Sequence, residues 1–197
     1  MRIAVLGATG ATGTLMVATA LAQGLPVTAI ARRPERVAAR PGLTVVTAEV
    51  TEPQSVADAV AGCDVLLSGL GGDVLATGAK AVVASGIDRI IWLGAFGTGP
   101  SAATAGVLTR TLLAAVMRNE LPDKVAADAT IIAAGGTVFH VGPMSDGPDS
   151  PGRRTLPLNQ APKRLFPRGV SRATVAAAMV DEAERDQHPG QTVTVVG

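Results

Sequence analysis

Three glycines close to the N-terminus have a spacing suited to binding a phosphate group. Gly7, Gly10 and Gly13 follow the apolar run Ile3–Leu6 and precede a helical pattern over residues 14–22. In a strand, glycine turn and helix of this kind, the first glycine allows the turn, the second lets phosphates approach the backbone, and the third lets the helix pack on the strand. The helix start offers free N–H groups and a positive dipole end. The run predicts a site for the pyrophosphate of a dinucleotide.

The spacing of these glycines is G-x-x-G-x-x-G, which differs from the commoner G-x-G-x-x-G. The alternative interpretation is a strand-to-helix turn that binds no ligand. Ala11 and the threonines Thr9 and Thr12 complete the glycine loop and are expected to contact the same ligand. A threonine hydroxyl there either bonds a phosphate or caps the helix start, and the sequence leaves both roles open for Thr12.

Two adjacent arginines, Arg32 and Arg33, follow the second apolar run, residues 27–31. In dinucleotide-binding folds an acidic residue at this strand end binds the ribose hydroxyls of NAD, whereas an arginine accommodates the 2′-phosphate of NADP. A guanidinium is always charged and offers a planar fork of donors to a phosphate. The pair therefore predicts NADP(H) as cofactor in preference to NAD(H). The alternative is a pair of solvated charges on a loop.

The elements that must position these residues alternate along the chain. Apolar runs typical of strands occupy residues 3–6, 27–31, 43–47, 65–68, 89–93, 137–141 and 192–196. Helical patterns lie at residues 12–23, 53–61, 75–84, 107–119, 124–134 and 172–185. The first five runs lack polar alternation, as strands covered on both faces do. This order predicts an α/β protein with a doubly wound, Rossmann-type parallel sheet in three layers, formed by one domain over residues 1–197.

Two stretches depart from this alternation. Pro122 interrupts a helical pattern and predicts a break between two segments. Residues 146–169 are rich in proline, glycine and basic side chains, which predicts a long surface loop near the cofactor edge of the sheet. Loops of such length are often lids or binding segments, and a disordered excursion is the alternative.

Charge and composition exclude several classes of protein. The 17 basic and 16 acidic side chains give a net charge of +1, so we expect no nucleic-acid partner and no membrane surface. No apolar run approaches the ~20 residues that span a bilayer, and the chain begins directly with a strand, which leaves no room for a signal peptide. We expect a cytoplasmic protein without a metal site, either a monomer or a homodimer. The single cysteine, Cys63, is expected to be a buried thiol.

Several segments together resemble a known family. They are residues 7–13, 31–34, 48–51, 64–69, 89–97 and 141–148, and they follow one another in the family's order. The chain resembles the atypical short-chain dehydrogenases/reductases, in particular the NmrA-like proteins and the small NADPH-dependent flavin reductases of the biliverdin reductase B group. The resemblance covers nearly the whole chain, but this group includes reductases, epimerase-like proteins and sensors without catalysis.

The resemblance implies contacts with the cofactor at the end of each strand. It places Glu49 and Val50 at the adenine, Ser68, Gly69 and Leu70 at the middle of the dinucleotide, Gly94, Ala95 and Phe96 beside the nicotinamide, and Gly142, Pro143 and Met144 on the other side of that ring. It also places Lys124 where relatives carry a lysine that contacts the nicotinamide ribose. An ordinary surface lysine is the alternative.

The chain departs from the family where proton donors are expected. It contains no tyrosine, so the Tyr-x-x-x-Lys pair of standard short-chain dehydrogenases is excluded, and Gly94 and Ala95 stand where relatives often have a serine. His140 replaces a frequent arginine; it is either a core residue or an acid. His188, beside Pro189, is expected in a solvated loop. Lys124 and His140 are therefore the candidates for a catalytic side chain.

The absence of a side-chain acid at the expected positions limits the reactions that we expect the protein to catalyse. A flavin can accept a hydride and take its proton from solvent, whereas an alcohol dehydrogenase or sugar epimerase needs a side-chain acid or base. The sequence predicts an NADP(H)-dependent reductase of a planar acceptor such as a flavin or a quinone. Two alternatives stay open: a non-catalytic, NmrA-like redox sensor, and a sugar epimerase or dehydratase.

Overall fold

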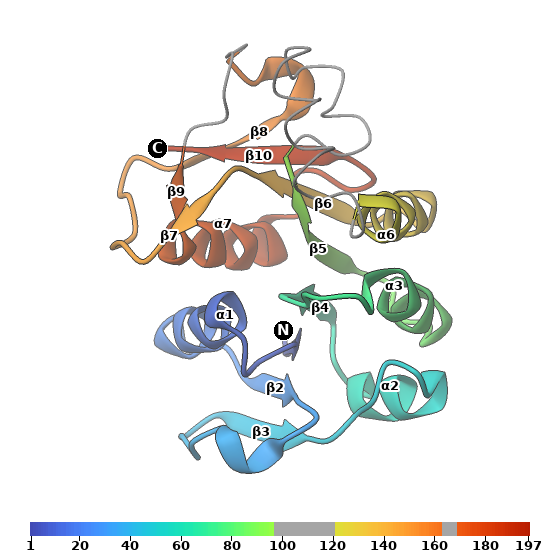
Figure 1. The fold of residues 1–197 in the computed structure, drawn as a ribbon. Helices are drawn as coiled ribbons and strands as arrows, with labels where there is room; N and C mark the ends of the chain where they lie inside the picture. Colours follow the sequence, from blue (N-terminus) through green and yellow to red (C-terminus); the bar gives the residue numbers. More distant parts are fainter. Residues whose placement is uncertain (97–120, 163–168) are drawn as a thin grey trace.

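A sheet of eight strands forms the middle layer of the protein (Figure 1). The computed structural model describes residues 1–96, 121–162 and 169–197. The strands lie in the order β3-β2-β1-β4-β5-β6-β10-β8. Their bounds are β1 (Ile3–Leu6), β2 (Val27–Ile30), β3 (Leu43–Val46), β4 (Val65–Ser68), β5 (Ile90–Ala95), β6 (Thr137–Val141), β8 (Arg154–Pro157) and β10 (Thr192–Val196). All neighbours pair in parallel except β8, which runs antiparallel to β10.

Helices cover both faces of this sheet (Figure 1). Their bounds are α1 (Ala11–Ala22), α2 (Pro53–Val60), α3 (Leu75–Ala84), α6 (Leu121–Ala133) and α7 (Arg172–Arg185). Helices α1 and α7 pack together on one face, and α2, α3 and α6 lie on the other. Each face has its own apolar core, because the side chains of each strand point alternately to the two sides. The prediction of a single, three-layered, Rossmann-type α/β domain is confirmed.

The point at which the strand order reverses indicates the edge of the sheet at which a ligand can bind. From β1, the strand order continues through β2 and β3 toward one edge of the sheet, and through β4, β5 and β6 toward the other edge. Ligands of such sheets bind outside the carboxyl ends of the strands, where this order reverses. That edge lies beside the ends of β1 and β4, and it carries the glycine loop.

The predicted elements agree with the structure to within a few residues. Helix α6 begins at Leu121 instead of residue 124, so Pro122 lies in its first turn. A proline costs no helical hydrogen bond there, because the first N–H groups of a helix have no partner within it. The helix predicted at residues 107–119 lies outside the described residues. In the described part of the chain, no helix has the length and apolar character needed to cross a membrane.

The segment predicted as one long loop contains a strand. Residues 154–157 form β8, which pairs with the outer edge of β10, with Leu156 opposite Thr194. A short 3₁₀ turn, Leu158–Gln160, follows it. The prediction of a continuous loop over residues 146–169 is wrong at these positions. Four residues with one proline carry too little periodicity to indicate a strand, and the open edge of β10 supplies the hydrogen-bond partners.

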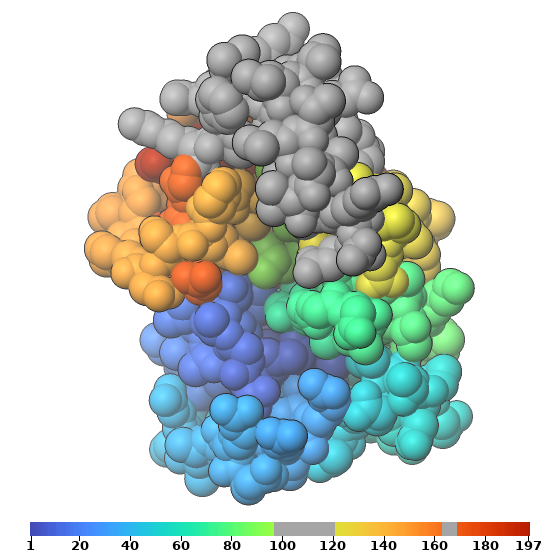
Figure 2. Space-filling model, in the orientation of Figure 1, coloured from blue at the N-terminus to red at the C-terminus, as the bar shows by residue number. Residues whose placement is uncertain are grey.

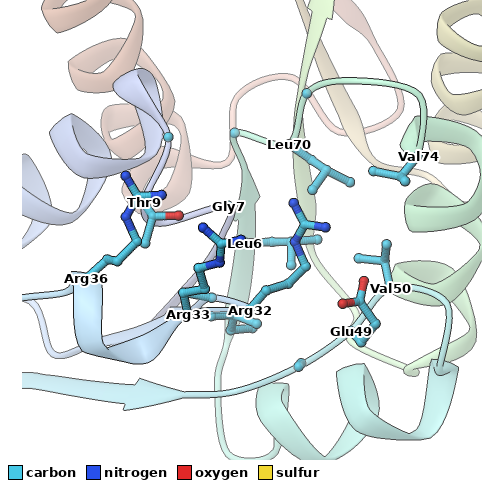
Figure 3. A pocket seen from close by; sticks show the side chains of 16 residues that line it. Leu6, Gly7, Thr9, Arg32, Arg33, Arg36, Glu49, Val50, Leu70 and Val74 are labelled. Atoms are coloured by element: carbon cyan, nitrogen blue, oxygen red, sulfur yellow. The ribbon is translucent and has the colours of Figure 1, made fainter.

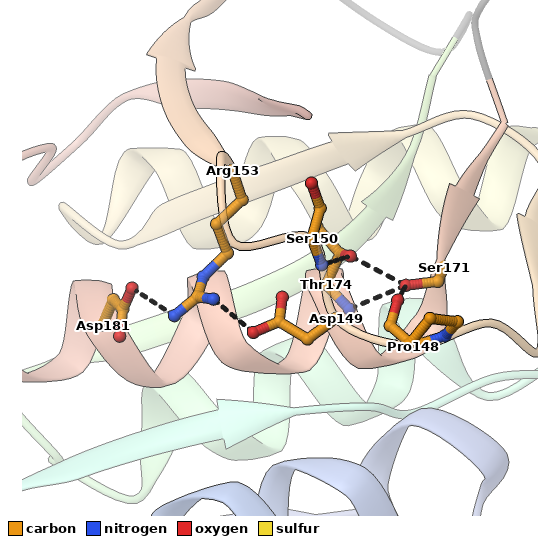
Figure 4. A network of polar contacts seen from close by, with 7 residues as sticks. All are labelled: Pro148, Asp149, Ser150, Arg153, Ser171, Thr174 and Asp181. Atoms are coloured by element: carbon orange, nitrogen blue, oxygen red, sulfur yellow. Dashed lines mark hydrogen bonds and ion pairs between the residues drawn. The ribbon is translucent and has the colours of Figure 1, made fainter.

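Side-chain contacts attach the segment before β8 to helix α7 (Figure 4). The guanidinium of Arg153 pairs with the carboxylates of Asp149 and Asp181, and its Nη2 lies 2.9 Å from Asp181 Oδ2. Ser171 caps α7, because its Oγ accepts the backbone N–H of Thr174 at 3.0 Å. The Ser171 hydroxyl also donates to the Pro148 carbonyl at 2.7 Å. These contacts hold the chain that follows β6 against both the start and the second half of α7.

Candidate cofactor-binding site

The glycine loop has the conformation that its spacing predicts. Gly7 has a φ of +76°, which L side chains rarely adopt, and the Gly10 N–H donates to the Gly7 carbonyl at 2.9 Å. A Cβ on Gly13 would lie 2.2 Å from the Gly7 oxygen, so only glycine allows α1 to start so close to β1. Gly10 is the N-cap of α1, and no side chain caps this helix. The start of α1 therefore suits an anion.

The glycine loop also packs against the end of β4. A Cβ on Gly69 would lie 3.2 Å from the backbone nitrogen of Gly13, and a Cβ on Gly7 would lie 3.1 Å from the carbonyl carbon of Gly69. Ser68, at the end of β4, is 1% exposed, and its hydroxyl accepts the N–H of Leu70 at 3.3 Å. Gly69 is thus needed for backbone packing as well as for space at the predicted site.

A cavity of about 280 Å³ opens on one side of the glycine loop (Figure 3). We call it the arginine cavity. Its lining contains nine of the residues predicted to bind the cofactor: Gly7, Thr9, Gly10, Arg32, Arg33, Glu49, Val50, Gly69 and Leu70. A third arginine, Arg36, also lines it. The sequence analysis missed Arg36 because the 3₁₀ turn Pro34–Arg36 brings it back toward Thr9, as Figure 3 shows.

The arginine cavity is strongly basic. Arg32, Arg33 and Arg36 are exposed side chains that reach toward it, and Glu49 is the acidic residue among its lining. The backbone of Glu49 is fixed by Ser55, whose Oγ accepts its N–H at 2.9 Å and donates to its carbonyl at 3.0 Å. Three guanidiniums around one opening have the charge and the hydrogen-bond donors that a phosphate group needs.

A second cavity, of about 380 Å³, lies on the other side of the glycine loop. We call it the α6 cavity, because Lys124 and Asp128 of α6 line it. The remaining lining comes from the glycine loop, the chain after β4, the start of α3, strand β5 and the chain after β6: Gly10, Ala11, Thr12, Gly69, Leu70, Gly71, Leu75, Trp92, Leu93, Gly94, Ala95 and Met144. Figure 2 shows the blue, green and orange surfaces of these distant segments meeting on one face.

The two cavities share part of their walls. Gly10, Gly69, Leu70 and Gly71 line both. An extended ligand can therefore lie across the glycine loop with one end in each cavity. A dinucleotide has this shape, with its pyrophosphate between two nucleosides.

Some predicted residues do not line either cavity. They are Gly13, Ser68, Phe96, His140, Gly142 and Pro143. The Phe96 N–H donates to the Val141 carbonyl at 2.8 Å, which joins the ends of β5 and β6. Thr12 does not cap α1, because it lies within the helix; its Oγ1 is 4.0 Å from the sulfur of Met144. The remaining predicted residues are brought together at the sheet edge, and their contacts with a cofactor stay predictions.

The sequence analysis missed the two acidic residues of α6. The carboxylate of Asp123 accepts the N–H groups of Leu75 and Ala76 at 2.8 and 3.1 Å, so it caps helix α3 from a neighbouring helix. Asp128 lies 2.9 Å from Nε2 of His140. Both are aspartates within a helical pattern, and nothing local distinguishes them from solvated residues.

The two histidines are both buried. His140 is fully buried, as the core interpretation of this residue predicts. His188 is 9% exposed, and its Nδ1 lies 2.8 Å from Oε2 of Glu182. The prediction that His188 lies in a solvated loop is wrong, because the chain after α7 folds back and places it against the helix.

The chain belongs to the NAD(P)H-binding family, whose sequence model matches residues 7–186. This match covers the glycine loop, both arginines and the whole of α6. No curated protein sequence matches the chain significantly.

Solved structures share the fold over the whole chain. ChuY, an anaerobillin reductase from Escherichia coli O157:H7, has a TM-score of 0.84 and 21% identity, with 100% of this chain and 97% of that chain covered. The oxidoreductase ylbE from Lactococcus lactis has a TM-score of 0.82 and 17% identity, with coverages of 99% and 90%. A short-chain dehydrogenase/reductase from Veillonella parvula in complex with NADP has a TM-score of 0.80 and 18% identity, with coverages of 100% and 94%. The chain therefore shares the fold of these proteins over its whole length.

Proposed function

We propose that this protein is an NADP(H)-dependent oxidoreductase that reduces a planar acceptor such as a flavin or a quinone. The observation that carries the proposal is the pair of joined cavities with three arginines at one end. The adenosine half of the dinucleotide would occupy the arginine cavity, with the 2′-phosphate among Arg32, Arg33 and Arg36. The pyrophosphate would lie on the glycine loop at the start of α1.

The other half of the cofactor would occupy the α6 cavity. The nicotinamide supplies a hydride when bound, and the protein binds and orients it. Trp92, Leu93 and Met144 give that cavity apolar walls, which suit a flat ring system stacked on the nicotinamide. Lys124 lines the same cavity, and its proposed role is to contact the nicotinamide ribose.

Two further observations support a planar acceptor. The chain contains no tyrosine, so a tyrosine-dependent alcohol dehydrogenation is excluded. ChuY, which shares the fold, is named as a reductase.

The test is a titration with NADPH and NADH, followed by addition of FMN while the absorbance of the reduced nicotinamide is recorded. We expect NADPH to bind at least about tenfold more tightly than NADH, a difference of about 1.4 kcal/mol. We expect FMN to drive its oxidation. Tight binding of NADPH without oxidation by FMN or by quinones would favour the sensor alternative. No binding of either nucleotide would contradict the proposal.

A further inference from the structure

A buried carboxyl–imidazole pair lies at the inner end of the α6 cavity. Asp128 of α6 and His140 of β6 are 4% and 0% exposed, and Oδ2 of the aspartate lies 2.9 Å from Nε2 of the histidine. Asp128 lines the cavity, whereas His140 does not. Among the described residues that line this cavity, Asp128 and Lys124 are the two with ionisable side chains.

Gly94 brings this pair directly against the end of β5. A Cβ on Gly94 would lie 2.9 Å from Oδ1 of Asp128 and 2.8 Å from Cδ2 of His140. A serine at this position, which the family resemblance leads one to expect, would collide with the pair. The chain therefore has a carboxyl group beside the strand end where the nicotinamide is expected, in place of a strand-end hydroxyl.

A second buried pair shows what a purely structural arrangement looks like. Glu182 and His188 also lie 2.8 Å apart, but Glu182 in addition accepts the backbone N–H of His188. Glu182 lines a separate cavity beside β8, and neither residue lines the arginine cavity or the α6 cavity at the cofactor edge. Asp128 differs because it lines the α6 cavity. A carboxyl group that is hydrogen-bonded to a buried imidazole and also lines a cleft lies where it can exchange a proton with a bound ligand.

We propose that Asp128 donates the proton that accompanies hydride transfer, and that His140 is the positioning residue that holds it. The inference rests on the proposed function. The hydride moves from the reduced nicotinamide to a carbonyl carbon of the acceptor, and the C=O π electrons move to its oxygen. That oxygen takes the proton from the Asp128 carboxyl group, and the resulting carboxylate stays hydrogen-bonded to His140. Water restores the proton after product release, so NADPH, acceptor and H⁺ give NADP⁺ and the reduced acceptor.

The proposal extends the acceptors to planar conjugated carbonyl compounds. Reduction of FMN requires no proton from the protein, because the reduced ring can be released as an anion. Reduction of a carbonyl such as that of 9,10-phenanthrenequinone by hydride addition to carbon leaves an oxyanion that must be protonated. A comparison of the two acceptors therefore tests proton donation separately from hydride transfer in the same protein.

The experiment compares Asp128→Asn with the wild-type protein on both acceptors. We expect the ratio of kcat with 9,10-phenanthrenequinone to kcat with FMN to fall at least about 100-fold. Glu182→Gln, the matched change in the other buried pair, should alter neither reaction. His140→Gln should shift the pH profile of kcat for the quinone and leave that for FMN in place.

Other results would overturn the inference. An Asp128→Asn variant that keeps quinone reduction, or that loses both reactions equally, would show that the pair only supports the fold. If that variant does not fold, the inference is tested on the wild-type protein in deuterium oxide. This solvent should slow the quinone reaction and not the FMN reaction. A wild-type protein that reduces FMN but not the quinone contradicts the inference alone. A wild-type protein that oxidises NADPH with neither acceptor contradicts the proposed function as well.

Discussion

The Cα atom of Gly13 faces the carbonyl oxygen of Gly7 so closely that a Cβ would lie 2.2 Å from that oxygen. We predict that Gly13→Ala lowers the free energy of unfolding by more than about 2 kcal/mol, because α1 must move away from β1. It should also weaken NADPH binding. Urea unfolding and a nucleotide titration measure both. Gly152→Ala is the control, because a Cβ there meets no atom within 4 Å; equal stability of the two variants would contradict the prediction.

The arginine cavity should decide between the two nicotinamide cofactors. We predict that Arg32→Ala lowers the affinity for NADPH at least about tenfold, since a hydrogen bond to a charged group contributes about 1.5–3 kcal/mol. The affinity for NADH should not change, because NADH lacks the 2′-phosphate. Arg36→Ala should also lower the affinity for NADPH. Arg40, an exposed arginine outside the cavity lining, provides the control variant Arg40→Ala. Equal losses for both nucleotides after Arg32→Ala would contradict a phosphate contact.

Asp123 caps a helix to which it does not belong. Its carboxylate accepts the N–H groups of Leu75 and Ala76 at the start of α3, where a negative charge is favourable. We predict that Asp123→Ala lowers the free energy of unfolding by about 1 kcal/mol, as the loss of an N-cap does. Chemical denaturation measures this. Asp88→Ala, at an exposed position, should have a smaller effect; a similar loss in both variants would refute the capping role.

Glu182 fastens the end of α7 to the chain that follows it. Its two oxygens lie 2.8 Å from the backbone nitrogen and from Nδ1 of His188. We predict that Glu182→Gln lowers the free energy of unfolding by about 2 kcal/mol, because one of these charged, buried hydrogen bonds is lost. Glu184→Gln on the same helix is exposed and should leave the stability unchanged. Hydrogen exchange at the amide of His188 should increase in the first variant and not in the second.

Most of the sheet could be predicted from local pattern. Apolar runs indicate β1, β2, β3, β4, β5, β6 and β10. The first five of these runs lack polar alternation, because strands covered on both faces need none. β8 could not be predicted, since its pairing depends on the free edge of β10 and not on its own four residues. His188 was placed in solvent for a similar reason: its burial depends on Glu182, six residues away.

The local sequence alone is enough to predict the glycine loop and the position of the arginines after β2. Spacing along one strand, turn and helix is enough to place Gly7, Gly10 and Gly13 in contact, because these residues are neighbours in the chain. Only the tertiary structure brought Asp128 of α6 to His140 of β6, and left room for both at Gly94. That contact depends on how α6 packs on the sheet. The free energy of such packing comes from many apolar side chains on both elements, and no single residue pattern encodes it.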